Sequence, residues 1–268
     1  MSQDPYASIA NTDVSLQQRL AQALELRAAD RAQHEMLESY LSELNLPHGA
    51  RVLEVGSGTG AISRAISRLP SVSSVVGVDP SPVFVDKANE LSGEFDGVRF
   101  AIGDGQELQF DNGEFDLVVL HTTLCHMPDP EKGLAEARRV LKSGGVLAIF
   151  DGDYVTATVA ISESDPLQRA LEITIQNFVQ HPWLSRQLPG LLGQQGMRIE
   201  SFRSHGYTKS SELAYFMSLL ERGFDLMVEA NTLSADAAQA LRQEAVHRED
   251  TGRFFGHISY VSVISRKE

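Results

Sequence analysis

The chain has 268 residues, of which 42% are hydrophobic and 22% are charged, and its net charge is −13. This composition suits one large domain with a packed core, and the acidic balance argues against nucleic-acid partners, which need clustered lysine and arginine. The first residues lack the features of a signal peptide, no apolar run is long enough for a transmembrane helix, and Cys125 is the only cysteine. We therefore expect a cytoplasmic protein with no membrane span, no disulfide and no multi-cysteine metal site.

The N-terminal part of the chain predicts helices. Residues 14–46 carry apolar side chains at three- and four-residue spacings, Leu37 and Leu41 among them. Residues 28–30 are a candidate break in this helical region. We treat residues 1–48 as an N-terminal helical segment, and we expect it to form a lid together with a later helical insertion.

From residue 51 onward, predicted strands alternate with predicted helices, which is typical of βαβ units and a mainly parallel sheet. The expected strands are 51–55, 75–78, 98–102, 115–120, 146–150, 197–205 and 258–265. The expected helices are 59–69, 82–91, 131–141 with Gly144 as its stop, 166–179, 183–195 and most of 212–247. We predict a doubly wound, Rossmann-like, seven-stranded sheet with an antiparallel last strand, in a domain over 49–268 with helical insertions at about 160–195 and 210–250.

A glycine-dense turn follows the first predicted strand. Gly56, Gly58 and Gly60 would let the backbone turn sharply and approach a ligand, and the next helix offers free N–H groups at its start. The spacing of Gly56, Gly58 and Ala61 fits a dinucleotide, whereas the three glycines fit a cofactor without a pyrophosphate. A tight turn with no ligand is the third interpretation.

Three acids occur near the ends of the first three predicted strands. Asp79 would lie beside the glycine turn and accept hydrogen bonds from both hydroxyls of a ribose, besides capping a helix. Glu54 is expected in a buried strand, where an unpaired carboxylate is costly, so we assign it to the site. Asp104 would accept from an exocyclic amine such as that of adenine, or else close a local turn.

The motifs "VLEVGSGTG", "VVGVDPS" and the tract from "GDGQELQF" to "GGVLAIFD" occur in this order between residues 50 and 152. Together they resemble the class I S-adenosylmethionine-dependent methyltransferases, in particular the small-molecule branch with the ubiquinone/menaquinone C-methyltransferases. The resemblance implies S-adenosylmethionine as the cofactor and assigns roles by position. The implied positions are Glu54, Gly56, Ser57, Gly58 and Gly60 at the methionine part and ribose, Asp79 at the ribose, Pro80 and Ser81 near the adenine, Asp104, Gly105 and Gln106 at its amine, and His121 and Thr122 at the methionine tail and sulfonium.

The residues that contact the methyl acceptor are predicted only as a set of candidates. Because the sulfonium is already a good leaving group, the enzyme chiefly aligns a nucleophile, and a base helps where that nucleophile carries a proton. His126, Asp153 and Tyr154 lie just beyond predicted strands and are candidate bases, although capping or packing would also explain His126 and Asp153. Arg27 would pair with the cofactor carboxylate, or else lie exposed on its helix.

We therefore predict a methyltransferase that acts on a small-molecule acceptor by in-line transfer. No metal is expected, because the histidines show no ligand spacing. A nicotinamide-dependent oxidoreductase, and a protein that uses the cofactor for a reaction other than methylation, are the alternatives. A homodimer is left open.

Overall fold

The structure, a computed structural model, describes residues 4–268, so residues 1–3 of the predicted N-terminal segment lie outside the described part. The strands are β1 (Ala50–Val55), β2 (Val72–Asp79), β3 (Val98–Ile102), β4 (Phe115–His121), β5 (Leu141–Thr158), β6 (Met197–Lys209) and β7 (Gly256–Lys267). The α-helices are α1 (Val14–Ala28), α2 (Arg31–Leu41), α3 (Ala61–Ile66), α4 (Pro82–Leu91), α5 (Pro130–Val140), α6 (Pro166–Phe178), α7 (Leu184–Gln194), α8 (Ala214–Glu229) and α9 (Ala235–Asp250). Short 3-10 turns are η1 (Ile9–Asn11) and η2 (Leu124–His126).

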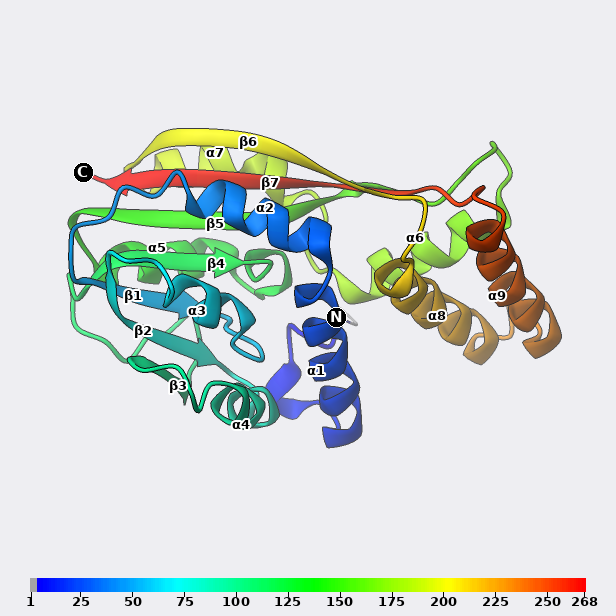
Figure 1. Ribbon diagram of the computed structural model, residues 1–268, viewed down its shortest axis with the longest axis horizontal. Helices are drawn as coiled ribbons and strands as arrows, with labels where there is room; N and C mark the ends of the chain where they lie inside the picture. The colour runs from blue at the N-terminus through cyan, green and yellow to red at the C-terminus, as the bar shows by residue number, and fades with distance from the viewer. Residues whose placement is uncertain (1–3) are drawn as a thin grey trace.

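The strands form one seven-stranded sheet in the order β3-β2-β1-β4-β5-β7-β6 (Figure 1). Pairing is parallel from β3 through β5, and β7 runs antiparallel to both of its neighbours. The predicted sheet with an antiparallel last strand is therefore confirmed. The chain order changes direction at β1, which places the β1 and β4 ends at the point where ligands bind in doubly wound sheets.

Both faces of the sheet are covered, as the unbroken apolar strands predict. Val52 faces one core cluster with Leu37 of α2 and Ile66 of α3. The next residue, Leu53, faces the opposite cluster with Leu134 of α5 and Leu188 of α7. This alternation follows from the two-residue period of a strand and makes the sheet doubly wound.

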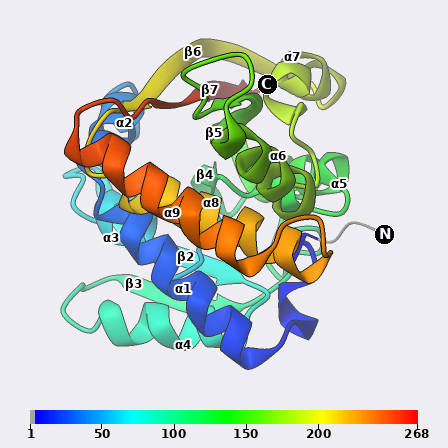
Figure 2. The same ribbon diagram turned by 90° about the vertical axis from the view of Figure 1, so that its right-hand side faces the viewer.

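The remaining helices gather beyond the carboxyl ends of β1, β2 and β4, where Figure 1 shows α1, α6, α8 and α9 together. Viewed toward that end, α1, α8 and α9 lie in front of the sheet (Figure 2). Leu20 of α1 packs with Phe84 of α4, and the hydroxyl of Thr174 in α6 donates to the carbonyl of Leu219 in α8 over 2.6 Å. These contacts fix a helical layer over the end of the sheet.

Some predicted boundaries are wrong, for reasons of pairing. Helix α5 ends at Val140, next to its predicted end at residue 141, but Gly144 is not its stop, because Leu141 already pairs with Phe115 in the sheet. Strand β5 continues past the predicted end at residue 150 as far as Thr158, which pairs with β7. The predicted break in the first helix is confirmed: α1 ends before Asp30, whose side chain caps α2.

Candidate functional site

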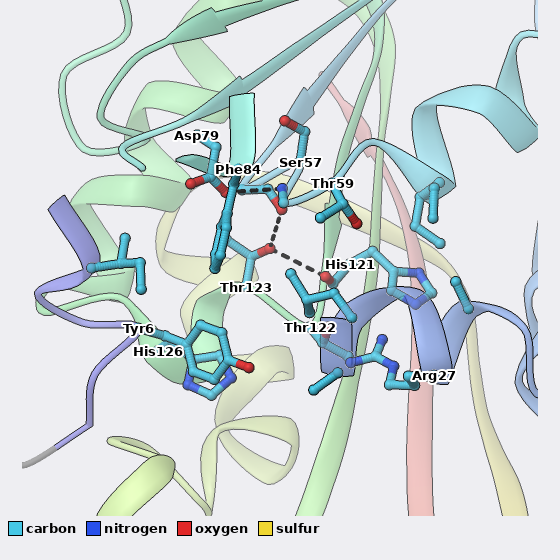
Figure 3. A pocket seen from close by; sticks show the side chains of 18 of the residues that line it. Tyr6, Arg27, Ser57, Thr59, Asp79, Phe84, His121, Thr122, Thr123 and His126 are labelled. Carbon is cyan, nitrogen blue, oxygen red and sulfur yellow. Dashed lines mark hydrogen bonds between the residues drawn. The ribbon is translucent and has the colours of Figure 1, made fainter. Parts of the chain in front are cut away.

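A cavity of about 700 Å³ opens at the carboxyl ends of β1, β2 and β4 (Figure 3). The turns after these strands line one side, and residues of the N-terminal segment 6–11 and of α1, α6 and α8 line the others. This is the edge at which the fold class binds its ligands. The sheet and the helical layer therefore enclose a single site between them.

The glycine loop, residues 56–60, connects β1 to α3 and contributes bare backbone to the cavity. Gly56 has a φ of 71°, and a Cβ on it would lie 2.3 Å from the Cγ2 atom of Thr123, so no side chain fits there. The hydroxyl of Ser57 is buried and has no hydrogen-bond partner among residues 4–268. Because a buried unpaired hydroxyl is costly, and Ser57 lines the cavity, this atom indicates where a ligand would bond.

Asp79 ends β2 with a buried side chain beside the glycine loop. The backbone N–H of Gly58 donates to its Oδ2 and that of Ser81 to its Oδ1, both over 2.9 Å. Burial raises the pKa of Asp79 to about 6. A carboxylate offers roughly four acceptor positions, so about two remain for hydroxyl groups of a ligand.

Glu54 lies two residues before the loop and is 1% exposed. The hydroxyl of Ser63 in α3 donates to its carboxyl group. Burial, opposed by this hydrogen bond, raises the pKa of Glu54 to about 8. The side chain lines the cavity and is mainly protonated, and hence uncharged, at neutral pH.

Asp104, Gly105 and Gln106 lie after β3 at the rim of the cavity. The backbone N–H of Gln106 donates to Oδ1 of Asp104 over 2.8 Å, so Asp104 does close the local turn that was the alternative interpretation. A Cβ on Gly105 would lie 2.5 Å from Cγ1 of Val55. The carboxylate of Asp104 is exposed and keeps acceptor capacity toward the rim.

His121 and Thr122 lie at the end of β4. The Nδ1 atom of His121 is 3.0 Å from the hydroxyl of Tyr40, and its ring stacks on Phe150 with the centroids 4.6 Å apart. Burial, and then the charge of Arg27, hold the pKa of His121 well below its usual range. His121 therefore stays neutral, and Thr122 beside it has a φ of 51°, which is strained for a β-branched residue.

Arg27 projects from α1 toward Thr122 (Figure 3). It makes no hydrogen bond or ion pair with another residue in the described range 4–268. Burial alone would lower its pKa, but the phenol groups of Tyr260, Tyr215 and Tyr154 raise it. The guanidinium therefore remains charged, and it can pair with a ligand carboxylate.

His126 lines the cavity from η2, below the ring of Tyr6 (Figure 3). Its Nδ1 atom is 2.8 Å from Oδ2 of Asp4, and its ring centroid is 4.7 Å from that of Tyr6. The same Asp4 oxygen accepts a hydrogen bond from the backbone N–H of Gln180 over 3.0 Å. Tyr154 also lines the cavity, and burial raises its pKa well above the usual range, so its phenol stays protonated.

Three of the predicted site residues do not line the cavity. Gly60 faces Phe100, which a Cβ would approach to 2.4 Å. Ser81 caps α4 through the backbone N–H of Phe84. Asp153 forms an ion pair with Arg186, with Nη2 and Oδ2 3.0 Å apart, so its carboxylate is held away from an acceptor.

Four residues of the site had no signal in the sequence. Asp4 and Tyr6 precede the first predicted helix, Thr123 follows β4, and Arg222 lies in α8. Only the folding of distant segments onto one cavity brings them together. Within residues 4–268, no group of histidine, cysteine, aspartate or glutamate side chains is placed to hold a metal, and no helix is long and apolar enough to cross a membrane.

Comparison with known proteins decides the family. A model described as "Methyltransferase domain" matches residues 53–149. The phthiotriol/phenolphthiotriol dimycocerosates methyltransferase of Mycobacterium leprae is 35% identical over 215 residues, which cover 73% of this chain and 78% of that protein. The chain belongs to the S-adenosylmethionine-dependent methyltransferases. The oxidoreductase alternative is not supported.

Further relatives of the methyltransferase agree. The ubiquinone/menaquinone biosynthesis C-methyltransferase of a Geobacter species is 31% identical over 128 residues, which cover 45% of this chain and 52% of that protein. A Bacillus halodurans structure described as a methyltransferase superposes with a TM-score of 0.63 at 20% identity, covering 86% of this chain and 98% of the other, which shows the shared fold. The chain spans 33% to 65% of the length of several other curated relatives.

The residues around the cavity fit the family's cofactor, S-adenosylmethionine. The unpaired hydroxyl of Ser57 and the remaining acceptor positions of Asp79 suit its polar groups. The unpaired guanidinium of Arg27 suits its carboxylate. The three glycines of the loop fit a cofactor without a pyrophosphate, and S-adenosylmethionine carries no phosphate group.

Proposed function

We propose that this methyltransferase binds S-adenosylmethionine in the cavity and transfers its methyl group to a small-molecule acceptor. One observation carries this proposal. A buried acid with free acceptor positions, Asp79, and a cation without a carboxylate partner, Arg27, line a single cavity on either side of the glycine loop. These groups match the ribose hydroxyls and the carboxylate that the cofactor carries on its two sides.

The individual roles follow from position. Asp79 accepts hydrogen bonds from the ribose, and Asp104 accepts from the adenine amine. Pro80 lines the cavity next to Asp79. Arg27 holds the methionine carboxylate through its planar fork. His121, which burial keeps neutral, bounds the methionine tail without adding charge beside the sulfonium.

Residues on the acceptor side move protons and exclude water. S-adenosylmethionine supplies the electrophilic methyl group when it is bound. His126 takes the proton of the acceptor at Nε2, while Asp4 accepts from Nδ1–H and so sets the tautomer. Tyr154 remains a phenol and donates a hydrogen bond to the acceptor. Asp153, which is paired with Arg186, is not retained as a base.

The N-terminal segment and the insertion at 210–250 act as a lid. Support comes from their position, because residues 6–11, α1 and α8 line the cavity on the side opposite the sheet. Exclusion of water favours transfer to the acceptor over side reactions. Hydrogen exchange with and without S-adenosylhomocysteine tests the lid: protection of both segments should rise, and unchanged protection would contradict it.

Several finer points remain part of the proposal. Two relatives are named for ubiquinone/menaquinone biosynthesis and for phthiotriol/phenolphthiotriol dimycocerosates, and we propose by analogy an acceptor with an apolar body. A cytoplasmic location and the absence of nucleic-acid partners rest on the sequence arguments above, and a homodimer is left open. Sedimentation of the purified protein tests the homodimer directly.

The experiment is incubation with S-adenosylmethionine that carries a deuterated methyl group, together with a metabolite extract of the source cells. Mass spectrometry should find one class of product that gains the labelled methyl, alongside S-adenosylhomocysteine. Consumption of the cofactor without labelled product would point to a reaction other than methylation. Binding of NADH in place of S-adenosylhomocysteine would overturn the proposal altogether.

A further inference from the structure

A second arginine faces the cavity from α8. Arg222 lines the cavity and is partly buried. Its guanidinium carbon lies 5.1 Å from the ring centroid of Phe178 in α6, which also lines the cavity. The ring therefore holds the charged end of the side chain at the cavity wall.

No carboxylate of the described chain pairs with Arg222. Its two acidic neighbours on α8, Glu221 and Asp225, both pair with Arg242 of α9. Arg222 itself takes part in no hydrogen bond or ion pair with any residue from 4 to 268. In a chain with 36 acidic and 23 basic residues, an arginine left without an acid at a cavity wall points to an anion that is brought by a ligand.

The cofactor does not supply this anion. Under the proposed function, its single carboxylate pairs with Arg27, and its ammonium and sulfonium groups add positive charge to the cavity. Glu54, which lines the same cavity, offers little compensation, because burial raises its pKa to about 8. Neither the cofactor nor Glu54 therefore supplies a negative charge for Arg222, and a low-dielectric site strengthens the attraction of its guanidinium for an anion.

Apolar side chains of α6 and α8 line the cavity together with Arg222. They are Ile175 and Phe178 of α6 and Leu219 of α8, and Phe178 is the ring that contacts Arg222. An apolar wall with one well-placed charged group is typical of sites for amphiphilic ligands. Arg222 is thus the group that would fix the orientation of a ligand there.

We propose that the acceptor is an amphiphile with an apolar body and one acidic group, and that Arg222 binds this acidic group. The inference rests on the proposed function, which makes S-adenosylmethionine the other ligand, but it concerns a residue on a different helix from Arg27. Arg222 lies outside the cofactor-binding set. Its loss should alter selection of the acceptor and leave binding of the cofactor unchanged.

The test uses a matched pair of fluorescent probes on the protein saturated with S-adenosylhomocysteine. Anilinonaphthalene sulfonate has an apolar body with one anionic group, and N-phenylnaphthylamine has nearly the same body without it. Arg222→Gln should raise the Kd of the anionic probe by about tenfold, the loss of one charge-assisted pair, and leave that of the neutral probe nearly unchanged. Arg222→Lys should retain most of the affinity.

Arg169→Gln is the matched control, since Arg169 is an exposed arginine on α6 whose partner is Glu172. Arg169→Gln should leave the Kd of the anionic probe and that of the neutral probe unchanged. Equal affinity of Arg222→Gln and wild type for the anionic probe, or an equal loss for both probes, would overturn the proposal. A wild-type measurement guards against misfolding of the variant: decanoate should displace the anionic probe at a lower concentration than decanol, and the reverse order would also overturn it.

Calorimetric binding of S-adenosylhomocysteine separates this proposal from the proposed function. Unchanged cofactor affinity in Arg222→Gln, combined with selective loss of the anionic probe, supports both. A wild-type protein that fails to bind S-adenosylhomocysteine contradicts the proposed function. A wild-type protein that binds it but shows no preference for the anionic probe contradicts only the role of Arg222.

Discussion

The Nδ1 atom of His126 lies 2.8 Å from Oδ2 of Asp4, although 122 residues separate them in the chain. The side chain of Asp4 is 1% exposed and that of His126 is 16% exposed. A carboxylate that accepts from Nδ1–H leaves a lone pair on Nε2 of the imidazole. The pair therefore both fixes the N-terminal segment over the cavity and prepares His126 to accept a proton.

His126→Gln should lower kcat by about a hundredfold or more, which is the usual contribution of a general base, while the affinity for S-adenosylhomocysteine changes little. Asp4→Asn should lower kcat less and shift the pH profile of kcat, because the tautomer and basicity of His126 change. Steady-state kinetics with the acceptor found by the labelling experiment measure both.

His247→Gln serves as the control for these variants, since His247 lies on α9 outside the cavity lining. It should retain full activity. If His126→Gln also retains full activity, His126 only anchors the N-terminal segment. A fall in activity of Asp4→Asn with an unchanged pH profile would mean that Asp4 has a purely structural role.

Asp79→Asn should weaken binding of S-adenosylhomocysteine by at least about tenfold. The amide loses an acceptor oxygen that serves the Gly58 N–H or the ligand hydroxyls, and charge-assisted hydrogen bonds are the stronger ones. Because the pKa of Asp79 is about 6, the wild-type affinity should also fall as the pH drops below that value. Asp86→Asn, an exposed site on α4, is the control, and equal affinities for all three proteins would contradict the role of Asp79.

Gly56→Ala should destabilise the protein and abolish cofactor binding. A side chain there must adopt a φ of 71° and would lie 2.3 Å from Thr123. Gly49→Ala is the matched control, because Gly49 has a φ of 76° but nothing lies within 4 Å of its Cβ position. The control should lose only the backbone term, roughly 1–2 kcal/mol, and Gly56→Ala roughly 1–3 kcal/mol more. Equal losses in denaturant unfolding would show that the crowding is absent.

Glu54→Gln should change how stability depends on pH. Burial raises the folded-state pKa of Glu54 from 4.5 to about 8, so the folded state binds more protons than the unfolded state between these values. The free energy of unfolding of the wild type therefore falls as the pH rises through this window. Glutamine does not titrate, so the Tm of the variant relative to that of the wild type should rise between about pH 5 and about pH 8. A constant difference in Tm would contradict the buried, protonated state.

Local signals predicted the parts of the fold that depend on neighbouring residues. Helix α4 begins at Pro82 and ends at Leu91 as predicted, because Ser81 caps it and proline favours its first turn. Asp79 and Gly56 come at the ends of two predicted parallel strands, so the sequence places both at one edge of the sheet. Both residues line the cavity. Local sequence signals for strands, turns and helix caps are therefore enough to predict where such residues lie.

The remaining features depend on contacts between distant segments. Strand β5 extends to Thr158 because β7 pairs with it, and no residue of the apolar run signals this. Asp153 was predicted as a candidate base because it follows a predicted strand, but its carboxylate forms an ion pair with Arg186 of α7. Arg222 belongs to a helix whose position over the cavity follows from the packing of α8 on α6, α9 and α1.

A crystal structure of the protein with S-adenosylhomocysteine tests the proposed site most directly. We expect its ribose at Asp79, its adenine beside Asp104 and its carboxylate at Arg27, with Ser57 Oγ in hydrogen-bond contact with the ligand. A ligand bound elsewhere, or bound here with Asp79 and Arg27 both turned away from it, would overturn the assignment of this cavity as the cofactor site.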